Sequence, residues 1–184
     1  MYQSPFTVNK TTTLKMRSFI GTRASLTNTA FIEKVELKAP VEPSSVVPGL
    51  TYRYYIGFFR RIHDYSSLAP VMTGTVPNVM IEERDREQYF AFTFEGLIKI
   101  PTDGFYIFYL KSNDGAQMLL DNRVLIDSDG LHPTAEKQQR IALKAGLHPI
   151  TVHYFQEGGT HHLQVGWQGP GFEKQDVPAS VVFH

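Results

Sequence analysis

Acidic and amide side chains are concentrated in one stretch of this chain, KSNDGAQMLLDNRVLIDSDG at residues 111–130. Between its short apolar runs lie Asn113, Asp114, Asp121, Asn122, Asp127 and Asp129. Side chains of these types form turns, bind a hard cation such as calcium, or supply two carboxylates for acid–base catalysis. The elements around each pair decide which use applies.

Two of these groups favour turn chemistry. Asp121-Asn122 separates the apolar runs QMLL and RVLI, and both residue types tolerate the positive φ of a tight hairpin turn. The alternating acids of 127–130 match part of a helix-loop-helix calcium loop, but the position of its closing glutamate holds Lys137. We therefore predict a hairpin turn at Asp121-Asn122 and a polar loop at 127–130.

Asn113-Asp114-Gly115 differs because it follows, after Lys111 and Ser112, a wholly apolar run, GFYIFYL at 104–110. Its side chains emerge where a strand ends and where the loops of a sandwich cluster. Two adjacent oxygen donors converge on one cation only if the backbone bends sharply, which Gly115 makes easier. The spacing favours a structural turn, with cation binding as the alternative.

Other catalytic and metal-binding patterns are weak. His161 and His162 are adjacent, so on a strand they point to opposite faces, and no HExxH motif accompanies them. His132 and His148 are explained by loop or hairpin packing.

There is no GxSxG motif and no cysteine, and the acids of IEERDRE (81–87) alternate with arginines as in a solvated loop. A glycosidase needs only two carboxylates among the 18 Asp and Glu, but no motif singles out a pair. We predict that this chain is not an enzyme.

Composition excludes several classes of partner. The 184 residues carry 18 Lys and Arg against 18 Asp and Glu, so no net field attracts nucleic acid or anionic lipid. No run approaches the ~20 apolar residues of a membrane helix. The opening MYQSPFTVNK lacks the features of a signal peptide, so we expect either a cytosolic protein or a chain that begins within a longer one. The lack of cysteine excludes disulfides without fixing the compartment.

Hydrophobic residues recur with a period of two along most of the chain. In YFAFTFEGLIKI, the positions Phe90, Phe92, Phe94, Ile98 and Ile100 share one face. The run 104–110 is apolar on both faces, as in a central strand. Strands at roughly ten-residue spacing, separated by Gly and Asn-Asp, predict an all-β, antiparallel β-sandwich.

Aromatic residues cluster at the start of this sandwich. In YRYYIGFF, alternation places Tyr52, Tyr54, Ile56 and Phe58 on one side and Tyr55 and Phe59 on the other. Exposed rings stack on sugar faces, but sandwich cores also use aromatic residues. We expect most of them, and Trp167, to belong to the core.

The composition changes near residue 40. KAPVEPSSVVPG contains three prolines, two serines and a glycine, which is typical of a linker. Before it, TTTLKMRSFIG and TAFIEKVEL predict two strands, too few for a stable sheet alone. We divide the chain into residues 1–40, a linker at 41–48 and a sandwich at 49–184. The first segment then needs partners outside this chain or, alternatively, docks on the sandwich.

The stretches at 49–59, 70–79, 90–132, 141–159 and 163–171 resemble, in this order, the protective-antigen-type (PA-14) domain family. The resemblance covers residues 49–184. It implies a β-sandwich that is usually a non-catalytic module binding carbohydrate, as in bacterial glycosidases, toxins and yeast adhesins.

The resemblance also implies a site. In the sugar-binding adhesins of the family, two successive aspartates joined by a cis peptide hold a calcium ion that coordinates sugar hydroxyls. The matching pair here is Asn113-Asp114, in which asparagine keeps an oxygen ligand but removes one charge. A later loop supplies a further ligand near Gln156-Glu157, and Glu157 could restore the charge. The implied calcium and carbohydrate ligands are therefore Asn113, Asp114 and Glu157.

Residues 2–25 and 28–34 are similar to the fibronectin-like accessory domain of chitobiase-type hexosaminidases. This resemblance implies the C-terminal part of a bacterial glycoside hydrolase such as a β-N-acetylhexosaminidase, located in the periplasm, at the cell surface or outside the cell. Its catalytic domain would lie outside this chain. The alternative function is a structural module that packs on that catalytic domain and binds no free glycan.

Overall fold

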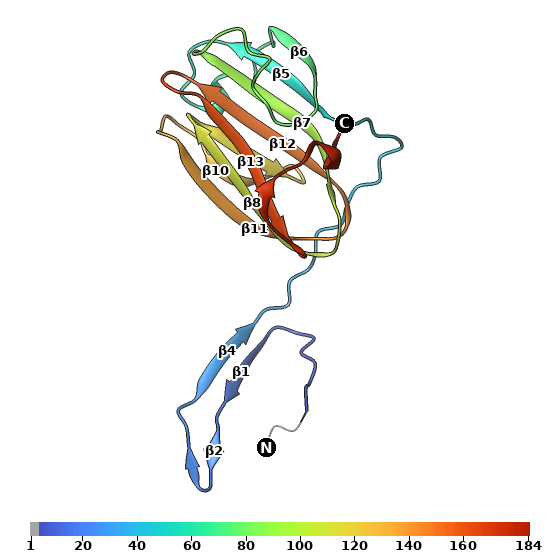
Figure 1. Cartoon of the computed structure of the whole chain (residues 1–184), viewed down its shortest axis with the longest axis vertical. Helices are drawn as coiled ribbons and strands as arrows, with labels where there is room; N and C mark the ends of the chain where they lie inside the picture. Colours follow the sequence, from blue (N-terminus) through green and yellow to red (C-terminus); the bar gives the residue numbers. More distant parts are fainter. Residues whose placement is uncertain (1–3) are drawn as a thin grey trace. The chain divides into compact units, whose positions relative to one another are not determined.

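The structure, a computed structural model, describes residues 4–184, which divide into two compact units between Glu36 and Leu37 (Figure 1). Each unit is described by itself. Within the described residues, no helix has the length and apolar character needed to cross a membrane.

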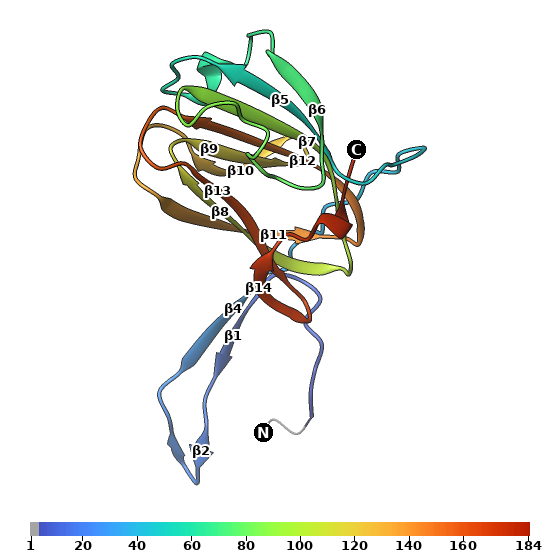
Figure 2. The same ribbon diagram turned by 45° about the horizontal axis from the view of Figure 1, so that its top comes forward.

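The larger unit consists of two antiparallel sheets, visible as layered ribbons in Figures 1 and 2. One has the strand order β10-β9-β12-β7-β5-β6, with β15 also paired to β7, and the other has the order β11-β8-β13-β14. The strands of the first are β5 (Leu50–Ile56), β6 (Met72–Val76), β7 (Phe90–Ile100), β9 (Ala116–Leu120), β10 (Arg123–Ser128), β12 (Gly146–Gln156) and β15 (Val182–Phe183). Those of the second are β8 (Gly104–Asn113), β11 (Ala135–Leu143), β13 (His162–Gly169) and β14 (Phe172–Asp176). Two short 3₁₀ helices, η1 (Ile62–Asp64) and η2 (Ala179–Val181), complete the unit. The predicted antiparallel β-sandwich is confirmed.

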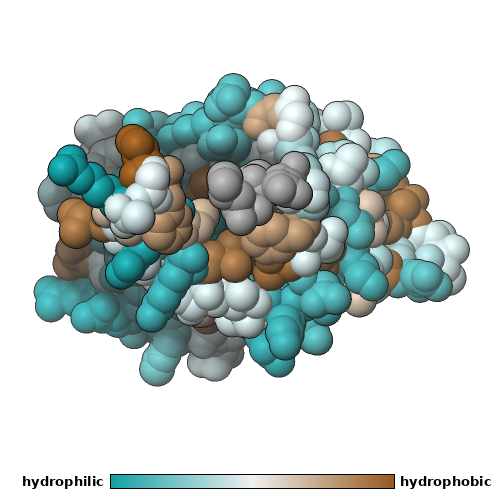
Figure 3. Space-filling view, turned by 90° about the horizontal axis from the view of Figure 1, so that it is seen from below, coloured by the Kyte–Doolittle hydropathy of each residue, from teal (hydrophilic) through white to brown (hydrophobic). Residues whose placement is uncertain are grey.

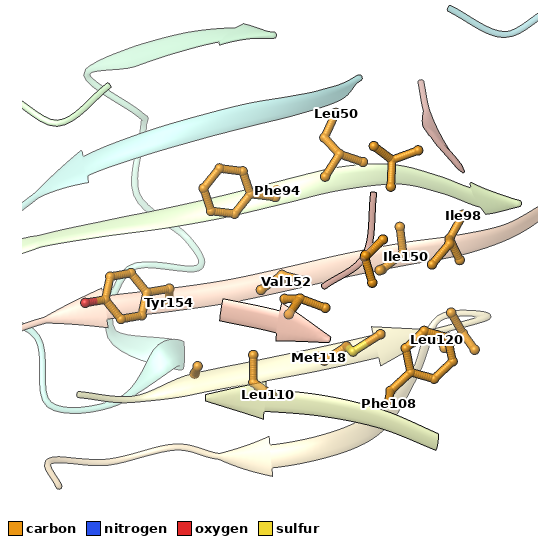
Figure 4. Close-up of a cluster of buried hydrophobic side chains, with 14 of the residues drawn as sticks. Leu50, Phe94, Ile98, Phe108, Leu110, Met118, Leu120, Ile150, Val152 and Tyr154 are labelled. Carbon is orange, nitrogen blue, oxygen red and sulfur yellow. The ribbon is translucent and has the colours of Figure 1, made fainter. Parts of the chain in front are cut away.

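The predicted period of two sets the register of the central strands. Strands β7 and β12 pair over their full lengths, with Phe94 opposite Val152 and Ile98 opposite His148. Alternate residues of both strands therefore point to the same side, toward the second sheet. Figure 4 shows the resulting core, in which Phe94, Ile150, Val152, Phe108, Leu110 and Met118 come from both sheets.

Most of the predicted aromatic core is confirmed. Tyr52, Tyr54 and Trp167 belong to the main core, whereas Tyr55 and Phe59 join a second buried cluster with Tyr65 on the other side of the sheet. The prediction is wrong for Phe58, which is 55% exposed because β5 ends at Ile56 and the chain turns before it.

The hairpin prediction at Asp121-Asn122 is also confirmed. Strands β9 and β10 are joined by these two residues, whose φ angles are 50° and 59°. Both residues thus adopt the left-handed conformation that the tightest hairpin turns require.

The smaller unit is a ribbon of β1 (Thr12–Met16) paired with β4 (Asn28–Ile32), extended by β2 (Phe19–Ile20) paired with β3 (Arg23–Ala24). None of residues 4–36 is buried. Its exposed apolar side chains include Phe19, Ile20 and Leu26. Figure 3 shows apolar side chains, in brown, exposed among polar ones.

The proline-rich segment after this ribbon runs along the larger unit. The Lys38 N–H donates to the Ala142 carbonyl at 3.0 Å, and the Val41 N–H donates to the Leu147 carbonyl at 2.8 Å. The segment predicted as a linker at 41–48 is therefore hydrogen-bonded to the sandwich.

Candidate functional site

The candidate site lies where β8 and β12 end. Strand β8 ends at Asn113, which is paired with His162 at the start of β13, and β12 ends at Gln156. The loops after these strands bring Asp114 and Glu157 together, although they are 43 residues apart in the sequence. The structure thus brings the three sequence-predicted residues Asn113, Asp114 and Glu157 to one edge of the sandwich.

The Asp114 side chain is held by main-chain amides from two other loops. Its Oδ2 accepts from the Glu157 N–H at 3.0 Å and the Gly158 N–H at 3.4 Å, and its Oδ1 accepts from the His132 N–H at 3.3 Å. The residue is only 8% exposed. These bonds fix three loops to one carboxylate, and they occupy three of its roughly four lone-pair positions.

Asn113 is held from the interior of the sheet. Its peptide bond to Asp114 is cis. Its carbonyl accepts from the Tyr154 hydroxyl at 2.5 Å, and its Oδ1 accepts from Gln156 Nε2 at 3.4 Å. Burial raises the pKa of the Tyr154 hydroxyl far above its usual range, so this group remains a donor. The buried amide of Gln156 also donates to the Gly158 carbonyl.

Gly115 allows the close approach of this turn to the sheet. A Cβ at this position would overlap the ring of Phe155. The Gly115 carbonyl also accepts from the Phe155 N–H at 2.9 Å. The glycine is therefore required by packing.

Glu157 contributes its backbone to this arrangement. Its N–H, and not its carboxylate, contacts Asp114. Among residues 4–184, no three or more His, Cys, Asp or Glu side chains form a group that could hold a metal ion. The sequence-predicted ligands Asn113, Asp114 and Glu157 all carry side-chain oxygens, the atoms that calcium prefers, although only the backbone of Glu157 contacts Asp114. These residue types fit a hard cation.

The polar loop predicted at 127–130 is confirmed only from Asp129 onward, because Asp127 and Ser128 are the last residues of strand β10. Asp127 Oδ1 accepts from the Asp129 N–H at 3.0 Å. Asp129 Oδ1 accepts from the N–H groups of Gly130 and Ile62, at 2.8 and 3.0 Å. These carboxylates are used to hold turns and to tie the loop to η1.

A polar cluster that the sequence patterns did not predict is formed by Arg84, Glu87 and His161, the last of which lies on the loop after Glu157. Arg84 Nη2 lies 2.8 Å from His161 Nε2, and His161 Nδ1 lies 3.2 Å from Glu87 Oε2. The prediction of a solvated loop at 81–87 holds for its other charged residues but is wrong for Arg84, whose side chain is 17% exposed. Its role depends on His161, 77 residues away, which local charge alternation does not reveal.

His132 and His148 have structural partners, as predicted. The buried His148 lies 3.1 Å from Asp121 Oδ1 and 2.9 Å from the Lys144 carbonyl. His132 Nε2 lies 2.9 Å from the Ser128 carbonyl. His161 and His162 do not share a ligand position, because His161 contacts Arg84 and Glu87 while His162 pairs with Asn113 in the sheet.

The antiparallel sandwich, with its acid- and amide-bearing loops at one edge, defines a module of the loop-presenting β-sandwich class. The PA14 domain family matches residues 64–180, more than half of the chain. The chain belongs to the PA14 domain family. PA14 is generally a binding domain.

Several solved structures share the fold. The PA14 domain of the MpAFP antifreeze protein is 14% identical with a TM-score of 0.65, covering 78% of this chain and 94% of that one. A PA14 sugar-binding domain from an RTX adhesin is 15% identical with a TM-score of 0.61, covering 75% and 99%. The Epithelial Adhesin 9 A domain from Candida glabrata, in complex with Galβ1-3GlcNAc, is 13% identical with a TM-score of 0.58, covering 78% and 92%. No curated protein matches this chain.

Proposed function

We propose that residues 49–184 form a non-catalytic carbohydrate-binding module whose site is the edge built by Asn113, Asp114 and Glu157. The observation that carries the proposal is that the loops after β8 and β12 bring Asn113, Asp114 and Glu157 to the same end of the sandwich. Two neighbours in fold support it, since one is a sugar-binding domain and another was solved with a disaccharide.

Calcium is the cation that this donor set suits best. Calcium takes six to eight oxygen ligands in flexible geometry, so one carboxylate, one amide oxygen and sugar hydroxyls can share its shell. Asp114 supplies one negative charge, and the carboxylate of Glu157 supplies a second. The bound ion would supply a positive charge to which vicinal sugar hydroxyls bind.

The parent protein that we propose is a bacterial glycoside hydrolase acting outside the cytoplasm, such as a β-N-acetylhexosaminidase. Residues 1–40 would be the end of its fibronectin-like accessory domain. The lack of buried residues within 4–36 supports this assignment, because a two-stranded ribbon without a core is marginal by itself. Sequence immediately upstream tests it: a hexosaminidase barrel is expected there, and an unrelated domain would contradict the assignment.

Calcium titration tests the site itself. Calcium chloride is added to the metal-free protein, and the unfolding temperature is followed with and without Galβ1-3GlcNAc, because a ligand that binds only the folded state stabilises it. Glu157→Gln is the sharpest variant, since it removes the carboxylate and keeps the main-chain bond to Asp114. Asn113→Ala removes the second donor, and Glu173→Gln, at an exposed position on β14, is the matched control.

We expect calcium to raise the unfolding temperature of the wild type and the control, and to raise it less in both site variants. A glycan array with calcium and with EDTA then identifies the sugar.

A second function, a structural module that binds no free glycan, is favoured by the three amide bonds that Asp114 makes. No calcium-dependent shift and no glycan on the array would replace the first function by the second.

A further inference from the structure

The outer face of the four-stranded sheet carries a row of apolar side chains that the core does not use. Strand β8 lies between β11 and β13 and buries Tyr106, Phe108 and Leu110 against the other sheet. Alternation places Phe105, Ile107 and Tyr109 on the opposite face. The outward face of an antiparallel sandwich strand is ordinarily polar, so an apolar row at this position is unusual.

The sheet is hollowed beside this row. A cavity of about 400 Å³ is lined by Tyr109, Glu136, Gln164, Gly166, Lys174 and Asp176, together with Gln175. Gly166 is the direct register partner of Tyr109, so the position facing the tyrosine has no side chain. The volume lies within the range of small-molecule binding sites, roughly 300–1,000 Å³.

Long cationic side chains lie over the two aromatic rings of the row. Lys174 Nζ is 4.1 Å from the Tyr109 ring centroid, and Arg140 Cζ is 4.7 Å from the Phe105 ring centroid. Both cations are on flexible stems, so they can swing aside or donate hydrogen bonds to a ligand that covers the rings. Phe105 is 45% exposed even with Arg140 in place, whereas Tyr109 is only 8% exposed, so a ligand reaches the Tyr109 ring when Lys174 moves aside.

The residues beside the row carry charges of both signs, together with hydrogen-bond donors and acceptors. Lys174 pairs with Glu136 at 2.5 Å, and Gln164 Nε2 donates to Asp176 Oδ1 at 2.6 Å. The Tyr109 hydroxyl also donates to Gln168 Oε1 on β13 at 3.0 Å. Paired charges and amides suit an uncharged ligand rich in hydroxyl groups better than an anion or a cation.

We propose that this face is a second binding site, which takes a neutral oligosaccharide chain laid along β8 with its sugar rings on Phe105 and Tyr109. Four residues separate these two rings, or about 13 Å along the strand, which is longer than one sugar ring. Sugar C–H faces stack on aromatic rings, while the flanking amides and charges bind the hydroxyls. A protein partner fits less well, because a row one side chain wide falls short of the roughly 800 Å² that each side of a stable interface buries.

This second site does not depend on the proposed calcium site at Asn113, Asp114 and Glu157. Asn113 lies four residues beyond Tyr109, again about 13 Å along the strand, so the chain on Phe105 and Tyr109 needs no calcium. Binding in EDTA therefore separates this proposal from the proposed function, which fails without the ion.

The test is calorimetry in EDTA with chitohexaose, cellohexaose, xylohexaose and mannohexaose, and with the corresponding monosaccharides. We expect at least one hexasaccharide to bind, with its monosaccharide much weaker. Phe105→Ala and Arg140→Ala change exposed side chains and should fold normally, which circular dichroism checks. Phe105→Ala and Tyr109→Ala should each weaken binding about tenfold or more, and Arg140→Ala should weaken it less.

Val124→Ala on β10 is the matched control, since Val124 is a 54% exposed apolar residue on the other sheet and should leave the affinity unchanged. Backbone amide shifts on hexasaccharide addition should map to β8, β11 and β13. Three outcomes overturn the proposal: no hexasaccharide binds at millimolar concentration, Phe105→Ala binds like the wild type, or sedimentation shows a dimer that Phe105→Ala dissociates.

Discussion

Replacing Asp114 by alanine tests whether its carboxylate holds the loop edge together without any cation. The change removes one acceptor shared by the amides of His132, Glu157 and Gly158, at 3.3, 3.0 and 3.4 Å. Only the Glu157 bond has a length within the usual range, so it dominates the estimate. A hydrogen bond to a charged group contributes about 1.5–3 kcal/mol, and the two longer bonds add roughly 0.5 kcal/mol each.

The expected loss of unfolding free energy is therefore about 2.5–4 kcal/mol, or roughly 5–16 °C in unfolding temperature for a unit of this size. Urea unfolding in EDTA measures it, because chelation removes any contribution from a bound ion. Asp127→Ala is the control, since the exposed carboxylate of Asp127, near the end of β10, accepts only the N–H of Asp129 and its loss should cost roughly 0.5 kcal/mol. A loss below about 1 kcal/mol for Asp114→Ala in EDTA would refute this account of the edge.

Three further predictions concern the frame around the site. Gly115→Ala should cost about 1–3 kcal/mol in urea unfolding, because its Cβ would overlap the Phe155 ring; an unchanged midpoint would contradict the packing argument. Tyr65→Phe should cost about 1 kcal/mol, since the buried hydroxyl donates to two main-chain carbonyls at 3.2 and 3.3 Å, and equal stability would show that these bonds contribute nothing. Burial lowers the pKa of the His153 ring below 6.5, so as the pH falls the unfolded chain takes up a proton at this residue before the folded protein does. The contribution of His153 to the unfolding free energy should therefore be fully present above pH 6.5 and decrease as the pH falls toward the folded pKa. His153→Gln should flatten this decrease in a series of unfolding temperatures against pH, and an unaltered slope would assign it to other groups.

Local patterns in the sequence were enough to predict the sandwich and its turns. A period of two identifies strands whatever their partners, because side chains alternate between faces of the pleat. The Asp121-Asn122 turn was equally predictable, since positive φ is a property of these residue types. The pair Asn113-Asp114 could be placed at the end of a strand for the same local reason.

Phe58 and Arg84 show where such patterns fail. Alternation placed Phe58 on the same side as Tyr52 and Tyr54, but β5 stops two residues earlier, and Phe58 is exposed. Arg84 lies among alternating charges that indicate solvent, yet His161 from a distant loop covers it. For Arg84, the deciding contact comes from outside the window in which the pattern was seen.

By itself, the sequence determined that this chain forms strands, where they turn, and which residues carry oxygen donors, because these properties depend on a few neighbouring residues. Only the tertiary structure decided that Asp114 is surrounded by amides from loops 18 and 43 residues away. It alone also decided which face of the apolar strand β8 is buried. Both outcomes depend on the order of strands in the sheets, which brings distant segments together and which no local periodicity specifies.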